Sequence, residues 1–496
     1  MSNQICKLRS FSRNLRYNFG EDLKILFCSS EVFPFVKTGG LADISNTLPK
    51  ELSKLGHKIK IILPKYKQIP EEKFELEKVL EDISVPILDQ NANIYLTNLP
   101  NTNIMVYLVE NDEYYNREVI YGGYSDNLER FEFFSLVILE LIKNREMDVD
   151  IVHCNDWQTS FIPIYLKLKN NRGTFYRDIK SLLTIHNLGY QGIFEKAKYP
   201  KLGLDWKYFT SKYLEFYDKI NILKGGIVFA DSLNTVSEQY SEEIQTPEFG
   251  HGLDGVLRER SNDLHGIING IDYSIWNPST DEYIWKNYNI DTLENKKYNK
   301  KKLQDKYDLP ESHHPLIGIV SRLVSQKGID LVIQSIEILK ELDLQLVVVG
   351  TGSREYEKKL SEASDKYSNK ISVTIEFNPK SAHQIEAGAD IFLMPSQYEP
   401  CGLNQMISLK YGTIPIVRET GGLADTIKDI DEHKDGNGFS FKKYDALEMI
   451  KTIIRAINTY KKEDKWKKLI ISAMKYDFSF QKSARKYEKL YYNILQ

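Results

Sequence analysis

The sequence predicts an α/β protein built from two doubly wound domains, and three observations support this. The chain has 496 residues, of which 42% are hydrophobic, and this length exceeds what a single hydrophobic core normally supports. Short apolar runs alternate with helical patterns along the chain, as in parallel sheets covered by helices. The hexapeptide TGGLAD occurs twice, at Thr38–Asp43 and Thr420–Asp425, so each half contains a similar glycine loop.

The first half opens with an apolar run at residues 22–30, a glycine-rich turn, and a stretch at 41–56 whose leucines and isoleucine recur at helical spacing. This pattern predicts a strand, a loop and a helix. Further strands are expected at residues 58–64, 103–110, 149–157, 181–187 and 232–237. The first half is therefore expected to contain a parallel sheet.

A second series of strands is predicted to begin near residues 265–272, with a helix at 328–342. Its later strands are expected at residues 315–323, 344–352, 370–377, 389–396 and 413–419. Residues 277–307 are rich in charge and predict a solvated arm. Residues 466–495 predict a mostly amphipathic helix that could cross back to the first domain.

These patterns divide the chain into four parts. They are an N-terminal tail at 1–21, a first domain at 22–265, a second domain at 266–470, and a C-terminal helix at 471–496 that packs back on the first domain. The first twenty residues contain basic residues and serines but no acid, which fits either a frayed tail or a transit peptide. The frayed tail is preferred; a transit peptide would imply a plastid.

Charge and cysteine usage exclude several classes of function. A net charge of -3 gives no bulk field for nucleic acid or an anionic membrane, and no apolar run approaches the roughly 18 residues of a membrane span. The four cysteines lie far apart without a CxxC pair, which indicates a reducing compartment and no structural zinc. A cytoplasmic protein without nucleic-acid or membrane partners is expected.

The two TGGLAD segments are candidate ligand loops. In open parallel sheets, ligands bind beyond the carboxyl ends of strands, where glycines let the backbone approach and helix N-termini meet anions. Two such loops facing one cleft would explain the repeat. The alternative is that both are ordinary strand-to-helix turns, which also favour paired glycines.

Three charged residues in the second half support the interpretation that the TGGLAD segments bind a ligand. Arg322 follows a predicted strand and Lys327 lies five residues later, so a guanidinium and an ammonium could converge on one phosphate. Glu399 precedes a predicted helix N-terminus and could hold sugar hydroxyls. Solvated surface charge, or a capping carboxylate in the case of Glu399, is the alternative. Together with the second TGGLAD, these residues favour a nucleotide-sugar site.

The first half offers polar residues at two strand ends. His186 and Asn187 end one predicted strand, and Asp156 ends another beside Trp157. Aromatic faces beside amide and carboxyl groups suit a carbohydrate. A structurally satisfied histidine and a helix N-cap are the simpler alternatives.

Seven segments, in order, resemble one known family. They are EVFPFVKTGGLADISNTLPKEL, HCNDWQTS, TIHNLGYQG, NGIDYSIWNP, SRLVSQKGID, AHQIEAGADIFLMPSQYEPCGLNQM and YGTIPIVRETGGLADTI. They look like the bacterial glycogen synthases and plant starch synthases of glycosyltransferase family 5. The resemblance runs from about residue 22 to the end and is far more specific than one glycine loop.

The resemblance implies the GT-B fold, two Rossmann-like doubly wound domains facing a deep interdomain cleft. It implies retaining transfer of glucose from ADP-glucose to the non-reducing end of an α-1,4-glucan, without metal or cofactor. The matched catalytic positions are His186, Arg322, Lys327, Glu399 and Asp43. The matched donor-binding positions are Lys37, Gly39, Gly40, Phe377, Cys401, Gly402, Leu403, Thr420, Gly421 and Gly422, with Phe377 stacking on adenine. The matched acceptor positions are Tyr115, Asn187 and Asp156, of which Tyr115 lies in the least similar segment.

The chemistry follows from these groups. Departure of a diphosphate leaves negative charge that Arg322, Lys327 and helix amides would stabilise in a water-poor cleft. No sequence feature marks a carboxylate nucleophile, so same-face attack assisted by the leaving phosphate is favoured over a covalent glucosyl-enzyme. Activity is expected to require domain closure.

Three alternative functions compete with this one. The same machinery could use UDP-glucose or a different acceptor. A nicotinamide oxidoreductase would require GxGxxG after the first strand and an acidic residue about twenty positions on, which neither half has. A non-catalytic glucan-binding protein would be expected to have lost Lys37, Arg322, Lys327 or Glu399, and all four are present.

Overall fold

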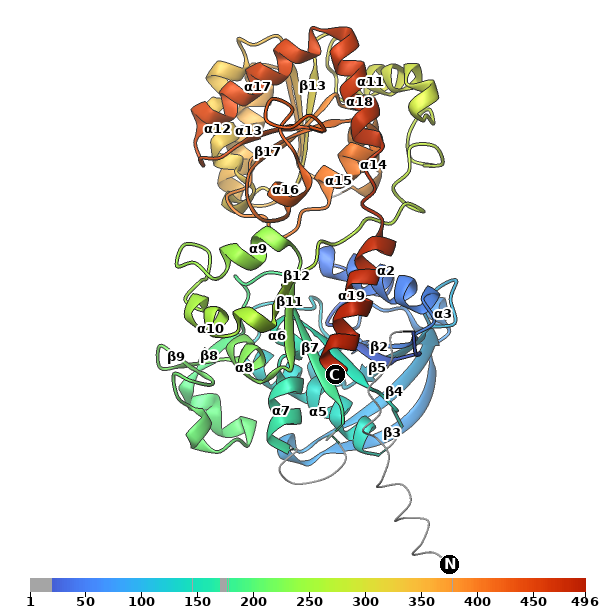
Figure 1. Ribbon diagram of the computed structural model, residues 1–496, viewed down its shortest axis with the longest axis vertical. Coiled ribbons are helices and arrows are strands. Elements are labelled where there is room, and N and C mark those ends of the chain that lie inside the picture. The colour runs from blue at the N-terminus through green and yellow to red at the C-terminus, as the bar shows by residue number, and fades with distance from the viewer. Residues whose placement is uncertain (1–19, 145, 170–175, 177, 377) are drawn as a thin grey trace, which may run out of the picture. The chain divides into compact units, whose positions relative to one another are not determined.

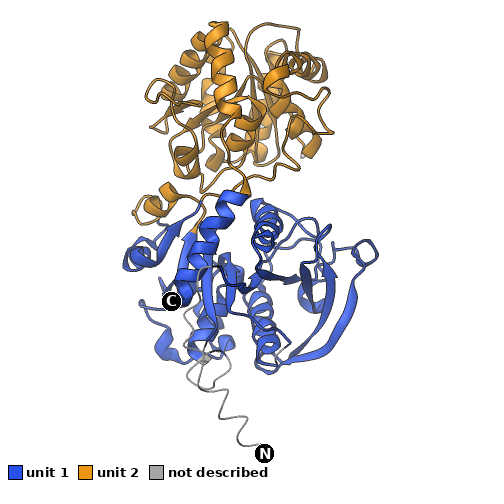
Figure 2. Ribbon diagram, turned by 45° about the vertical axis from the view of Figure 1, so that its right-hand side comes forward, with its two compact units in different colours: residues 1–234, 250–267, 481–496 blue, residues 235–249, 268–480 orange. Residues whose placement is uncertain are grey.

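The computed structural model describes residues 20–144, 146–169, 176, 178–376 and 378–496. The chain forms two compact units, coloured separately in Figure 2. The first contains residues 1–234, 250–267 and 481–496, and the second contains residues 235–249 and 268–480. Residues 1–19 of the predicted N-terminal tail lie outside the described residues.

The first unit is built on a nine-stranded sheet in the order β12-β11-β7-β6-β1-β2-β5-β4-β3. Strand β1 pairs in parallel with β2 and β6, and β2–β5 and β6–β7 are also parallel, whereas β4 runs antiparallel to β5 and β3. The strands are β1 Lys24–Cys28, β2 Lys58–Pro64, β3 Glu77–Val85, β4 Gln90–Asn98, β5 Met105–Glu110, β6 Ile151–Asn155, β7 Lys180–Ile185, β11 Ser232–Thr235 and β12 Leu264–Gly266. The predicted parallel sheet is therefore confirmed. The hairpin β3–β4 was missed, because β3 is an edge strand with mostly exposed side chains and no apolar run.

Helices and a small antiparallel sheet complete the first unit (Figure 1). Its helices are α2 Gly40–Lys54, α3 Glu71–Phe74, α4 Asp112–Tyr115, α5 Asn127–Lys143, α6 Asp156–Thr159, α7 Phe161–Lys169, α8 Ile222–Phe229, α10 Asp254–Glu259 and α19 Phe480–Leu495. The short 3₁₀ turns are η1 Pro86–Leu88, η3 Lys196–Leu202, η4 Trp206–Tyr208 and η5 Ser261–Asp263. The small sheet has the order β8-β10-β9, with β8 Ile193–Glu195, β9 Glu215–Phe216 and β10 Lys219–Asn221.

The second unit has a six-stranded, fully parallel sheet in the order β15-β14-β13-β16-β17-β18. The strands are β13 Leu316–Val320, β14 Gln345–Val349, β15 Ile371–Thr374, β16 Ile391–Met394, β17 Ile414–Arg418 and β18 Phe439–Phe441. The helices are α9 Glu238–Glu243, α11 Glu294–Lys306, α12 Ile329–Leu339, α13 Arg354–Lys366, α14 Pro379–Gly388, α15 Asn404–Tyr411, α16 Gly421–Thr426, α17 Ala446–Tyr460 and α18 Glu463–Met474, with η6 Ile290–Thr292 and η7 Ser325–Lys327. Branched and aromatic side chains of these strands and helices form one buried cluster. Both units thus have the predicted doubly wound α/β character.

The predicted first strand of the second half was wrong. The described strand in that region, β12, pairs in the first unit's sheet. The residues after it cross into the second unit, where Ile271 donates its N–H to the carbonyl of Phe478 at 2.8 Å. Gly270 is needed here because a Cβ at that position would lie 2.4 Å from the backbone nitrogen of Phe480.

The charge-rich segment 277–307 is not simply a solvated arm. Its second half forms α11, in which Leu303 is fully buried. Lys296 is also buried, and its ammonium donates to the carbonyl of Ala387 at 3.0 Å and to the Thr413 hydroxyl at 2.7 Å. Long lysine side chains can bury their methylenes along an apolar surface, so the charge count of this helix was a poor guide to its exposure.

The predicted C-terminal helix is broken into α18 and α19. Helix α18 belongs to the second unit, whereas residues 481–495 of α19 belong to the first. In the first unit the hydroxyl of Tyr491 lies 2.7 Å from Nδ1 of His153 on β6. The units also differ from the predicted ranges at 235–249, which group with the second unit because α9 packs on α16.

Within the described parts of the chain, no helix combines the length and the apolar character that a bilayer crossing requires.

Replacing Tyr491 by phenylalanine is expected to destabilise the first unit by about 1–3 kcal/mol. The substitution removes the partner of Nδ1 on a fully buried imidazole, whose pKa burial lowers well below its usual value, so the ring stays neutral and cannot gain solvent. The measurement is guanidinium unfolding monitored by circular dichroism. Lys489→Ala, which alters an exposed residue of the same helix, is the control and should leave the midpoint unchanged. An unshifted midpoint for Tyr491→Phe would contradict the role of this hydrogen bond.

Candidate active site

The first TGGLAD connects β1 to α2 at the carboxyl end of the central strand. Lys37 and Asp43 form an ion pair of 2.7 Å with both side chains partly exposed, so the loop presents charge to solvent. Glu31, which is 3% exposed, accepts hydrogen bonds from the N–H groups of Thr38 at 2.5 Å and Gly39 at 3.1 Å. The sequence predicted Lys37, Gly39, Gly40 and Asp43 here, but gave no sign of Glu31.

A second strand-end group lies on β6 and β7. The side-chain oxygen Oδ1 of Asp156 accepts the backbone N–H of His186 at 2.7 Å, and Nε2 of His186 lies 2.8 Å from Oδ1 of Asn155. The amide nitrogen of Asn155 donates to the carbonyl of Cys28 on β1 at 2.9 Å. Because this bond fixes the amide so that its oxygen faces the imidazole, Nε2 must carry the proton and Nδ1 is the unprotonated nitrogen.

Burial sets the protonation of both titrating groups. It lowers the pKa of His186 to about 3, so the imidazole is neutral near pH 7. Burial also raises the pKa of Asp156 to about 7, although the N–H groups of His186 and Asn187 oppose that rise. Asp156 has φ +56°, an uncommon backbone conformation for a residue with a side chain. The predicted residues His186, Asn187 and Asp156 are thus brought together.

Tyr115 was wrongly predicted to contact the acceptor. Its side chain is fully buried, and its hydroxyl donates to the carbonyl of Arg130 at 2.8 Å, so it cannot touch a ligand. Tyr121, from the same loop, is partly exposed, and its hydroxyl lies 2.9 Å from Oε1 of Glu31 and 2.8 Å from the hydroxyl of Ser30. The segment contains several tyrosines, and only packing distinguishes the core residue from the one beside the glycine loop.

In the second unit, Lys327 and Glu399 form the centre of the candidate site. The ammonium of Lys327 lies 2.5 Å from Oε2 of Glu399, and the hydroxyl of Ser396 donates to the same oxygen at 3.0 Å. Gly328 allows this approach, because a Cβ there would lie 2.0 Å from the carbonyl oxygen of Pro395. The sequence predicted both residues but not that they pair.

Arg322 is exposed just beyond β13. Its guanidinium contacts the side-chain oxygen of Gln326 at 3.3 Å. Arg322 and Lys327 are therefore on the same short connection, but the lysine is held by a carboxylate while the arginine extends toward solvent.

The second TGGLAD follows β17 and packs on the segment after Glu399. The N–H of Gly422 donates to the carbonyls of Glu399 at 3.1 Å and Pro400 at 3.2 Å. The N–H of Gly421 donates to Oε1 of Glu243 at 2.9 Å, and the hydroxyl of Thr420 donates to Oε2 of Glu243 at 3.2 Å. The expectation that these amides cradle the donor phosphates is therefore corrected: here they bind protein oxygens.

The N-terminus of α15 is a further candidate anion-binding element of this unit. Its N-cap residue is Leu403, which has no side-chain oxygen to bind the first N–H groups, and Gly402 before it has φ +67°. Cys401 is buried, and burial raises the pKa of its thiol to about 12, which makes it a packing residue and not a reactive thiol.

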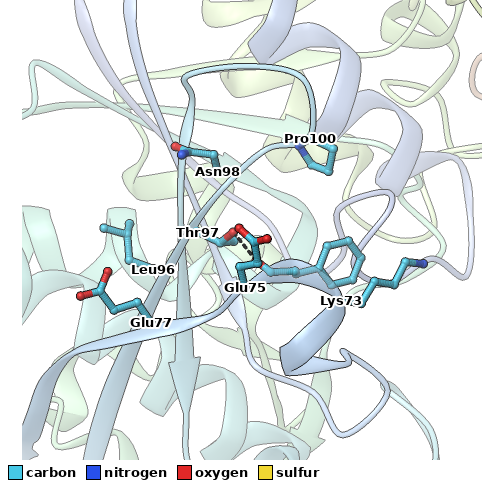
Figure 3. Close-up of a pocket in the computed structure, with 8 residues that line it drawn as sticks. Lys73, Glu75, Glu77, Leu96, Thr97, Asn98 and Pro100 are labelled. Carbon is cyan, nitrogen blue, oxygen red and sulfur yellow. Dashed lines mark hydrogen bonds between the residues drawn. The ribbon is translucent and has the colours of Figure 1, made fainter.

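Phe377, the predicted adenine-stacking residue, lies outside the described residues. A pocket of about 330 Å³ in the first unit lies beside β3 and β4 and is lined by Lys73, Phe74, Glu75, Glu77, Leu96, Thr97, Asn98 and Pro100 (Figure 3). None of the predicted site residues that the structure describes lines this pocket. Nor do the described residues contain three or more His, Cys, Asp or Glu side chains grouped as metal ligands.

Comparison with known proteins identifies the family of this chain. Residues 24–259 match the family model described as the starch synthase catalytic domain, and residues 299–471 match glycosyl transferases group 1. The chain is 48% identical over 482 residues to a glycogen synthase of Thermotoga maritima, covering 95% of this chain and 99% of that protein. The chain belongs to the glycogen and starch synthase family. It is therefore a glycosyltransferase.

Other members of the family are similar over nearly the whole chain. A glycogen synthase of Geotalea uraniireducens is 46% identical, covering 95% of this chain and 98% of that protein. The catalytic domain of starch synthase IV from Arabidopsis thaliana, solved bound to ADP and acarbose, is 33% identical with a TM-score of 0.87, covering 96% of this chain and all of that one.

The fold extends beyond the family. A sucrose-phosphate synthase from Thermosynechococcus elongatus is 15% identical with a TM-score of 0.58, covering 95% of this chain and 98% of that one. The predicted GT-B fold, with two Rossmann-like domains, is confirmed.

His186 is expected to remain neutral at pH 5, where an ordinary histidine is mostly charged. The unfolded chain binds this proton below about pH 6.5 and the folded chain only near pH 3, so His186 makes the fold less stable as the pH falls between those values. Imidazole ¹⁵N spectra, assigned with His186→Gln, should show the Nε2–H tautomer at pH 5 and at pH 8. Exposed His313 provides the internal reference. A charged His186 ring at pH 5 would refute the assignment.

Proposed function

We propose that this chain transfers glucose from ADP-glucose to the non-reducing end of an α-1,4-glucan with retention of configuration. The observation that carries the proposal is the ion pair between partly buried Lys327 and buried Glu399, beside the uncapped N-terminus of α15, in a chain 48% identical to a glycogen synthase. A cation, a carboxylate and free helix amides supply what a sugar diphosphate requires.

The groups that bind the sugar-nucleotide donor are assigned to the second unit. Lys327 and Arg322 are proposed to stabilise the charge that develops on the departing diphosphate, together with the N–H groups that begin α15. Glu399 accepts hydrogen bonds from the glucose hydroxyls while it holds Lys327 in place. Gly402 and Leu403 present the helix amides, and Phe377 is proposed to stack on the adenine.

The first unit is assigned groups that act on the sugar and the acceptor. Lys37 supports the donor phosphates and Asp43 orients the donor sugar. His186 is proposed to lie beside the anomeric carbon as a neutral imidazole, whose Nδ1 can accept a hydrogen bond from a sugar hydroxyl. Asn187 and Asp156 hold sugar, with Asp156 acting mainly through the backbone of His186.

The reaction breaks the bond between the anomeric carbon and the diphosphate oxygen and forms a bond from the same carbon to the O4 of the glucan. The O4 proton passes to the departing phosphate oxygen, so atoms and charge balance without an added base. A neutral His186 cannot donate a proton near pH 7, which supports this route over acid catalysis by the imidazole.

The partners follow from this reaction. They are ADP-glucose and a glycogen- or starch-like glucan, and no cofactor is invoked. The glycogen synthases compared above come from bacteria, which favours a cytoplasmic location over a plastid. UDP-glucose or another acceptor is the competing proposal.

Glucose transfer onto glycogen should be much faster with ADP-glucose than with UDP-glucose, and Lys327→Ala and Glu399→Ala should each lose about 10²–10³-fold in kcat. The lysine variant removes a cation from the departing charge, and the glutamate variant frees Lys327 and removes a sugar acceptor. The measurement is radiolabelled glucose incorporation with the two donors side by side.

Lys358→Ala is the control, because this lysine is 78% exposed on α13, and its activity should be normal. Preference for UDP-glucose would overturn the donor assignment. Absence of transfer from either donor would overturn the proposed reaction.

A further inference from the structure

Each TGGLAD loop is held by a buried glutamate from elsewhere in its own unit. In the first unit, Glu31 takes four donors: the N–H groups of Thr38 and Gly39, and the hydroxyls of Thr38 at 3.0 Å and Tyr121 at 2.9 Å. A carboxylate that accepts this many hydrogen bonds fixes the loop that carries Lys37.

In the second unit, Glu243 has the same relation to the second loop. It is 8% exposed, and it accepts the N–H of Gly421 and the hydroxyl of Thr420. Burial raises the pKa of Glu243, and these two hydrogen bonds oppose that rise. The shared pattern is one carboxylate that binds the loop threonine hydroxyl and the N–H that opens the following helix.

Glu243 is itself fixed by the second TGGLAD. Asp425, the last residue of that segment, accepts the N–H groups of Glu238 at 2.7 Å and Gln239 at 3.1 Å at the start of α9. Helix α9 ends at Glu243, so α9 and α16 each cap the first turn of the other. Displacing Glu243 would leave the N–H of Gly421 and the hydroxyl of Thr420 without this acceptor, so Glu243 acts as a fixed support.

Glu243 is connected to Glu399 and Lys327 through backbone contacts of the loop that it holds. Gly421 has φ +45°, and a Cβ there would lie 2.1 Å from the carbonyl oxygen of Glu399. The next residue, Gly422, donates its N–H to the same carbonyl at 3.1 Å. Any shift of the loop held by Glu243 therefore moves the backbone of Glu399, whose side chain pairs with Lys327.

We propose that Glu31 and Glu243 are positioning residues for glucosyl transfer, with Glu31 acting through the loop of Lys37 and Glu243 acting through the Lys327–Glu399 pair. This assignment rests on the proposed transfer reaction. It also changes the role of Gly421, whose N–H serves to anchor the loop and does not bind phosphate, because a second anion cannot occupy the position already held by the carboxylate.

Two double-mutant cycles test the assignment. Glu243→Ala should lower kcat/KM for ADP-glucose about tenfold or more in the wild-type background, but less than about twofold in the Lys327→Ala background, because the pair it positions is already lost. Glu31→Ala should behave in the same way with Lys37→Ala. In the crossed double variants, which combine Glu243→Ala with Lys37→Ala or Glu31→Ala with Lys327→Ala, the fold-losses in kcat/KM of the two single variants should multiply.

Global destabilisation would lower activity in every background, so it cannot produce this selective coupling. Glu242→Ala, which changes an exposed neighbour on α9, is the matched control and should match the wild type. If the alanine variants do not fold, Glu243→Gln and Glu31→Gln enter the same cycles, since glutamine keeps one acceptor oxygen and should give a smaller loss with the same coupling.

The outcomes separate the two proposals. An inactive wild-type chain contradicts the transfer reaction. An active wild type whose Glu31 and Glu243 variants keep normal kcat/KM, or lose it equally in all backgrounds, overturns the positioning role. Selective coupling supports it.

Discussion

Backbone N–H groups at the carboxyl ends of parallel strands are the constraint on which this site depends. There the chain leaves the sheet before a helix has formed, and a buried N–H without an acceptor costs about 1–3 kcal/mol. The protein meets this requirement with carboxylates. Asp156 binds the N–H of His186, and Glu31 and Glu243 bind the two glycine loops.

This solution has an electrostatic consequence. Carboxylates placed beside a site for an anionic donor would repel it unless cations balance them. Lys327 lies against Glu399, Lys37 lies against Asp43, and Arg322 extends toward solvent. Lys327 and Lys37 are therefore oriented in advance, and these two cations need little reorganisation when negative charge develops on a leaving group. A histidine kept neutral by burial adds polarity to the site without adding charge.

Glycine has a separate part in the same arrangement. At Gly421 and Gly422 a Cβ would lie about 2 Å from the carbonyl oxygens of Glu399 and Cys401. Only glycine therefore permits the second TGGLAD loop to pack against residues 399–401. In the second copy the TGG therefore reflects close backbone packing, whereas a Cβ at Gly39 of the first copy would meet nothing within 4 Å. In the second copy this packing also leaves both glycine N–H groups bound to protein oxygens.

The sequence by itself determined the alternation of strands and helices, the strand ends at which the candidate site residues lie, and Lys327 and Glu399 as site candidates, though not their pairing. These are local properties, because apolar periodicity and glycine turns act within a few residues. It failed at Tyr115, where several tyrosines share one segment and only packing separates core from surface. It also failed at the edge strand β3, at α11 and at the break between α18 and α19, where exposure or helix ends depend on neighbours.

Only the tertiary structure decided which acids hold the loops. Glu243 meets Gly421 across 178 residues and Tyr121 meets Glu31 across 90, and no local pattern marks a glutamate as an acceptor for a distant N–H. The sequence does not distinguish a glutamate that folding buries from one that stays in solvent. What separates them is the set of donors that folding places around each, and that set exists only once the chain is folded.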